Sequence, residues 1–193
     1  MRQSIKSVEN EYLEKMYQYV KNYFLNALKE EWSWEDFSLL LENLIYDCLI
    51  KIYSITIKAC KKIYNIDFTE IIDKDTIKDL TYSKDGKTLS ERLHNHYDNA
   101  VKRINPIDYF YNRLVLIMDT ETLYASNHVI HGKLKKYATY VEIIGISECS
   151  DEDGGLCEYY VSKGKMPIEE LDELPPYHPD CDCEIIYYIE DEE

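Results

Sequence analysis

Three residues of metal-binding type lie close together near the C-terminus of this sequence. His178, Cys181 and Cys183 fall within six residues, and Cys157 and Cys149 precede them in the same segment. Zinc binds four nitrogen or sulfur ligands in a closed tetrahedron, and it can stabilise a segment too short to form its own core. We therefore predict one structural zinc ion, held by Cys157, His178, Cys181 and Cys183. Cys149 is an alternative fourth ligand, and the alternative to any metal is a reduced segment whose cysteines simply pack.

Other candidate residues favour a structural role over a catalytic one. The triplet His94-Asn95-His96 spells out the name of a nuclease motif, but that motif consists of spaced residues on a different fold, and here the triplet falls within a predicted helix. His128 and His131, three residues apart on another predicted helix, are expected to be ordinary surface or core histidines. Glu121 is expected to cap a helix or to interact with its dipole.

The sequence also lacks common catalytic patterns. It has no Gly-rich phosphate loop, no Gly-x-Ser-x-Gly elbow and no His-Glu-x2-His pair. A closed four-ligand zinc shell leaves no position for the water that a catalytic zinc activates. We therefore predict no catalytic residues, no cofactor other than zinc, and no enzymatic activity.

Negative charge is concentrated at the C-terminal end of the chain. The formal net charge is −15, and residues 148–193 contain 16 acidic residues but only Lys163 and Lys165 as bases. The rest of the chain is nearly neutral. An acidic excess repels phosphate groups, so we expect no direct sequence-specific contact with nucleic acid. A basic protein surface is the more natural partner.

The sequence predicts neither a membrane span nor a signal peptide. Lys51 interrupts the most apolar run, Cys48 to Ile57, well short of the roughly 18 residues that a membrane span requires. The N-terminal residues lead into a charged amphipathic stretch. We therefore expect the protein to be made in the cytosol and not to associate with membranes. In the cytosol the six cysteines would be thiols or metal ligands rather than disulfides.

Apolar residues at helical spacing predict a mainly helical body. A first helix extends to about Leu28, and a second begins after a Ser33 cap and runs toward Ile63, so the two should form an antiparallel hairpin. Cys48 and Cys60 are expected to be small core residues of the second helix. Four further helical stretches are predicted: a short one between Asn65 and Ser83, one from a Thr88 capping box to about Ile104, one after Pro106 through Met118, and one from Thr120 to about Tyr137.

Two β-branched and aromatic runs, residues 138–146 and 184–189, predict strands that pair with each other. The segment between them is expected to be loop-rich. The predicted fold class is therefore α+β, a mainly helical body with a small antiparallel sheet and a C-terminal zinc-stabilised lobe. We divide the chain into an N-terminal helical hairpin (1–66), a central helical region (67–137) and a C-terminal β/zinc lobe with an acidic tail (138–193).

Several short motifs follow one another in a recognisable order. Residues 86–93 read Gly-Lys-Thr-Leu-Ser-Glu-Arg-Leu, residues 120–122 read Thr-Glu-Thr, and residues 175–183 read Pro-Pro-Tyr-His-Pro-Asp-Cys-Asp-Cys. This order resembles the phage Mu F-like family of minor head (head morphogenesis) proteins over about residues 80 to 190. Gly154 stands where the family has the first cysteine of a Cys-x2-Cys pair that ends at Cys157, and Asp119 and Asp182 stand where the family usually has basic residues.

The resemblance implies a structural component of the phage capsid or procapsid, with a role in head morphogenesis or in DNA packaging or ejection. Its expected partners are the portal protein, the major capsid protein or both, with a few copies in each virion. Its expected location is the portal vertex of the head, after assembly in the host cytoplasm. The alternative function is that of a metal-dependent nuclease or toxin-type effector carried by a phage or mobile element.

Overall fold

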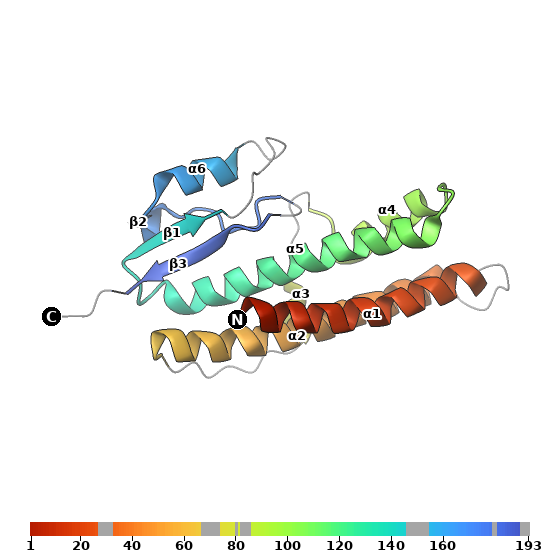
Figure 1. Cartoon of the computed structure of the whole chain (residues 1–193), viewed down its shortest axis with the longest axis horizontal. Helices are drawn as coiled ribbons and strands as arrows, with labels where there is room; N and C mark the ends of the chain where they lie inside the picture. The colour runs from red at the N-terminus through yellow and green to blue at the C-terminus, as the bar shows by residue number, and fades with distance from the viewer. Residues whose placement is uncertain are drawn as a thin grey trace.

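A helical body carries a small antiparallel sheet at one end (Figure 1). The computed structural model describes residues 1–26, 33–66, 74–79, 81, 86–145, 155–178 and 181–189. The helices and the three-stranded sheet in these ranges confirm the predicted mainly helical body and the predicted small antiparallel sheet. Among the helices in these ranges, none combines the length and apolar character needed to cross a membrane.

Three long helices form the body: α1 (Arg2–Asn26), α2 (Trp34–Tyr64) and α5 (Pro106–Leu134). Helices α1 and α2 run antiparallel, which confirms the predicted hairpin, and α5 packs against both (Figure 1). The short helix α3 (Lys74–Asp79) packs on α2, and α4 (Leu89–Ala100) contacts α2 and α5. Cys48 and Cys60 are buried core residues of α2, as predicted, and burial raises the pKa of their thiols to about 12 and about 11.

Polar caps fix where the helices begin. The side chain of Ser33 accepts a hydrogen bond from the backbone N–H of Asp36 at the start of α2. Thr88 and Glu91 form a reciprocal capping box at the start of α4. Asn105 caps α5, whose first residue, Pro106, needs no hydrogen-bond partner for its nitrogen. These local signals explain why the predicted starts of α2, α4 and α5 agree with the structure.

Helix boundaries further along were predicted less well. The helix that starts after Thr88 ends at Ala100, short of Ile104. The two stretches expected on either side of Asp119 are one continuous helix, α5. No proline or glycine occurs between Ile107 and Ile130, and the Thr120 hydroxyl donates back to the carbonyl of Leu116 instead of starting a new helix.

The sheet has the strand order β2-β1-β3, and both pairings are antiparallel. Strand β1 (Tyr140–Ile144) pairs with β3 (Glu184–Tyr188) over its full length, which confirms the predicted pairing, and with the two-residue β2 (Met166–Pro167) on its other side. The intervening segment is less loop-rich than predicted, because it contains α6 (Leu156–Lys163) and a short 3-10 turn, η3 (Ile168–Glu170). Helix α6 packs on β1.

A band of polar side chains is buried in the middle of α5. Glu121 is fully buried and forms an ion pair with Arg92 of α4, whose side chain is 14% exposed. The prediction that Glu121 acts at a helix start is therefore wrong, because it lies mid-helix on the face that packs into the core. One residue further, the Thr122 hydroxyl donates to the buried carboxylate of Glu9 in α1.

We predict that breaking the Arg92–Glu121 pair destabilises the fold strongly. Glu121→Ala leaves a guanidinium in a largely buried position without its carboxylate, which typically costs about 3–5 kcal/mol. The double variant Arg92→Met/Glu121→Leu, which buries no charge, should recover most of that loss. Urea unfolding followed by circular dichroism measures both.

The matched control for this prediction is Glu11→Ala, which removes a carboxylate from the exposed pair with Lys15 on α1. Exposed pairs contribute little, so its urea midpoint should stay close to that of the parent chain. Equal destabilisation by Glu11→Ala and Glu121→Ala would show that the buried pair contributes no more to the stability of the fold than an exposed pair.

Candidate metal centre

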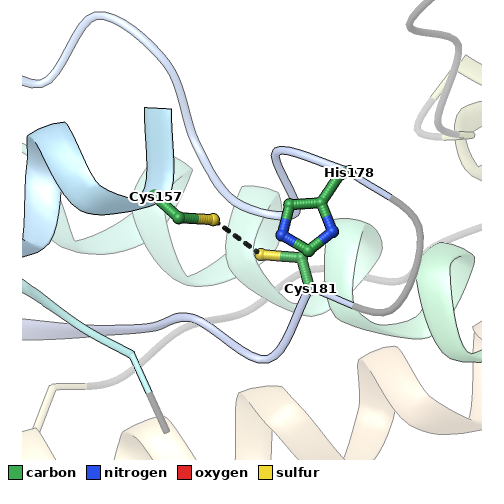
Figure 2. A group of neighbouring side chains, drawn as sticks. All are labelled: Cys157, His178 and Cys181. Atoms are coloured by element: carbon green, nitrogen blue, oxygen red, sulfur yellow. Dashed lines mark hydrogen bonds between the residues drawn. The ribbon is translucent and has the colours of Figure 1, made fainter. Parts of the chain in front are cut away.

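Three separate segments bring metal-binding side chains together at the C-terminal end of the fold. Cys157 lies in the first turn of α6, His178 in the loop that follows η3, and Cys181 just before β3. Figure 2 shows the Cys157 and Cys181 sulfur atoms facing each other, with the His178 ring beside them. Three of the four predicted ligands therefore meet in space, although 24 residues separate Cys157 from Cys181.

The geometry of this cluster fits a tetrahedral zinc ion. One ligand atom from each of Cys157, His178 and Cys181 lies within 4.8 Å of the other two. The sulfur atoms of Cys157 and Cys181 are 3.7 Å apart. Two thiolates that each bind tetrahedral zinc at about 2.3 Å would be about 3.8 Å apart. The two cysteines thus already have the spacing that zinc would impose, and a histidine nitrogen supplies a third suitable donor.

Cys183, the fourth predicted ligand, lies next to the cluster but is not one of its three close members. It is fully buried, just before β3, and its thiol is hydrogen-bonded to Cys181 and lies near Cys157. A Cβ atom added to Gly145 would be 3.6 Å from the Cys183 sulfur, an ordinary contact, and 3.3 Å from Cγ2 of Val161, so this glycine mainly eases the approach of α6. Cys149, the alternative ligand, lies outside the described residues.

The cluster is electrostatically suited to form a thiolate. The hydrogen bond from the Cys183 thiol is the main factor that lowers the pKa of Cys181, against the opposing effect of burial. The same bond raises the pKa of Cys183, which keeps its proton while it donates. Since thiolates rather than thiols bind metals, this lowered pKa favours the form of Cys181 that binds metal.

The surrounding side chains hold the loop that carries His178. The Asn127 side chain, buried in α5, donates a 3.0 Å hydrogen bond to the carbonyl of Pro175. Tyr177 stacks on Tyr160 of α6 with ring centroids 5.3 Å apart. Nε2 of His178 is buried. None of these supporting residues was predicted, because an Asn or Tyr carries no signal of its partner in a single sequence.

The other histidines lie elsewhere and make ordinary contacts. His94 is exposed on α4, with Nε2 3.6 Å from the carboxylate of Asp98. Nδ1 of His128 is hydrogen-bonded to the carbonyl of Tyr124, and Nδ1 of His131 lies 3.1 Å from the hydroxyl of Tyr187. Burial lowers the pKa of both. Within the described ranges, no second group of three or more potential metal ligands occurs.

Comparison with known protein families, with curated proteins and with solved structures gives no match for this chain. Its fold and the geometry of the candidate metal centre are therefore the basis for a functional assignment. The centre could hold a metal ion, and its donors are those that zinc prefers.

We predict that the purified chain binds one zinc ion per molecule. Cys157→Ala, His178→Ala and Cys181→Ala should each lose stoichiometric zinc, because each removes one of a closed set of ligands. Elemental analysis of the purified proteins measures the metal. Cys60→Ala, a change at a buried cysteine outside the cluster, is the matched control and should keep its zinc. A parent chain without zinc, whose thiols titrate freely in the native state, would rule out the site.

We further predict that Cys183 becomes the fourth ligand when metal is bound. Cobalt can replace zinc, and the intensity of its sulfur-to-metal charge-transfer band depends on the number of bound thiolates. Cys183→Ala should also lose stoichiometric zinc, and when it is saturated with excess cobalt it would leave two thiolates of three, so the band should fall by about a third. An unchanged band in this variant would show that the fourth position is filled by another group.

Proposed function

We propose that this chain is a phage minor head protein, a structural component of the capsid or procapsid that associates with the portal. The observation that supports this proposal best is that the separate motifs behind the family resemblance contact one another inside the fold. Arg92 belongs to the segment 86–93 and Glu121 to the segment 120–122, and these two residues form the buried ion pair. The two motifs therefore meet through their charged members.

The third motif joins the same framework. Asn127 lies less than two turns after Glu121 on α5, and it holds the carbonyl of Pro175 at the beginning of the segment 175–183. That segment then supplies His178, Cys181 and Cys183 to the metal centre. The motif residues thus act together as an internal scaffold, which is the role expected of structural rather than catalytic residues.

Charge supports a protein partner. Residues 148–193 carry a large acidic excess, and they include the strand, loop and helix that surround the metal centre. We infer that this lobe faces basic surfaces of the portal protein, the major capsid protein or both, in a few copies in each virion, at the portal vertex. A direct role in binding DNA would require a basic surface instead.

The alternative, a metal-dependent nuclease or toxin-type effector, gains no support from a specific contact. His94 and His96 lie on α4, at the end of α5 remote from the sheet and from α6 (Figure 1). A nuclease would need its metal, general base and substrate groove close together. We therefore expect no cleavage of double-stranded DNA by the zinc-loaded chain, tested with magnesium and manganese added.

Mass spectrometry of particles tests the proposed function directly. In procapsids and virions purified from the phage or prophage that encodes this chain, it should be detected in a few copies relative to the major capsid protein. Deletion of its gene should lower the yield of DNA-filled heads, as seen by electron microscopy and plaque counts. Expression from a plasmid of the Glu11→Ala variant, which is the stability control used above, should restore that yield. Absence of the chain from both kinds of particle would refute the proposal.

A further inference from the structure

A cavity of about 510 Å³ lies between the first turns of α1, the middle of α5 and the beginning of β3. This volume is within the range of pockets that bind small ligands or groups of side chains. Cys181 forms part of its wall, so the cavity adjoins the metal centre without including His178 or Cys157. None of the roles proposed above uses it.

One side of the cavity is the edge of the sheet. In the described part of the chain, β3 has a strand neighbour on one side only, which is β1. Tyr187 of β3 faces α5, since its hydroxyl meets His131 there. Ile185 lies two residues earlier on the same face and lines the cavity. Because side chains alternate along a strand, a strand added beside β3 would direct every second side chain toward the helices and into the cavity.

Both apolar and polar side chains line the cavity. Ile5, Leu123 and Ile185 supply aliphatic surface from three different elements. The polar part of the lining includes Glu9, which is 3% exposed and accepts the hydrogen bond from Thr122. A ligand that fits these walls needs an aliphatic part and a polar or charged group that reaches Glu9.

The charges of the lining favour a cation. Lys6 Nζ lies 2.7 Å from Asp119 Oδ1 and 3.2 Å from Glu9 Oε2, so two carboxylates share one ammonium. Across the whole lining, four acidic side chains face two basic ones, and Arg2 already pairs with Glu184 at 2.6 Å. The pKa of Glu9 is raised, mainly by burial, which means that Lys6 and Thr122 compensate its charge only in part. A second positive charge near Glu9 and Asp119 would complete the compensation.

We propose that the cavity and the edge of β3 together bind an extended segment of a partner protein, whose lysine or arginine side chain points at Glu9 and Asp119. Main-chain hydrogen bonds to β3 hold the segment, and aliphatic side chains on either side of the basic residue contact the apolar walls. The inference deepens the proposed function and rests on it only for the source of the segment, a neighbouring protein of the phage head.

Peptide binding by the full-length, zinc-supplemented chain tests this inference. The probe is the capped peptide Thr-Val-Thr-Lys-Thr-Val-Thr, which places two valines and the lysine on one strand face. Nuclear magnetic resonance titration of the isotope-labelled chain should show shifts confined to the cavity and β3. The same peptide with glutamate in place of lysine should bind at least about tenfold more weakly.

Variants of the chain test whether the lysine side chain of the peptide binds at Glu9. Glu9→Gln keeps the shape of the side chain and should weaken binding of the lysine peptide about tenfold, while binding of a norleucine peptide stays unchanged. Glu14→Gln, the same change on the exposed face of α1, is the matched control and should bind the lysine peptide like the parent chain.

Several results would overturn the inference. These are no binding of the lysine peptide, equal binding of the lysine and glutamate peptides, and shifts located away from the cavity. Concentration-dependent self-association in analytical ultracentrifugation that blocks the peptide would assign the cavity to a second copy of the chain instead. Particle mass spectrometry tests the proposed function without any peptide, so either proposal can fail while the other stands.

Discussion

The buried ion pair between Arg92 and Glu121 constrains how the other elements can be arranged around α5. A helix with a purely apolar face can rotate or slide against its neighbours at modest cost. A buried carboxylate has no such freedom, because any arrangement that separates it from its guanidinium leaves a charge in a medium of low polarity. The pair therefore fixes both the rotation of α5 and the position of α4. Thr122 with Glu9 and Ser126 with Thr56 extend the same constraint to α1 and α2.

This constraint reaches the metal centre through α5. Asn127 follows Glu121 by six residues, or about 9 Å along the helix, and it holds Pro175 in place. The loop from Pro175 to His178 is thereby tied to the helical body at its beginning, while Cys181 and Cys183 are tied to the sheet through β3. Cys157 arrives from α6, which packs on the other strand. A metal ion bound at their meeting point would cross-link these three segments.

The parts of the fold that could be predicted from sequence are those determined by local chemistry. The Ser33 and Thr88 caps mark helix starts because a short polar side chain satisfies the backbone there. The two strands are visible because β-branched and aromatic residues suit a pleated surface. The helix α6 is missed because only eight residues, with two glycines before it, carry a weak periodic signal. The continuity of α5 is missed because Asp119 and Thr120 also occur at helix starts.

The contacts that could not be predicted from the sequence are those between residues far apart in the chain. The spacing of His178 and Cys181 limits them to one loop, so their meeting is predictable, and Cys157 follows from the number of ligands that zinc needs. Glu121 could have been recognised as a buried charge, because it continues the apolar stripe that runs through Leu114 and Met118. Its partner Arg92 could not, since 29 residues and a helix boundary separate the two.

The metal centre and the cavity share a length of backbone, from Cys181 to Ile185, and this links their proposed functions. A metal ion that fixes Cys181 also fixes the beginning of β3, so less conformational entropy is lost when a partner strand pairs with that edge. By thermodynamic linkage, a strand bound along β3 must in turn favour metal binding to the same degree. Under these two proposals, bound metal would order the start of β3 before a basic partner segment pairs with that edge.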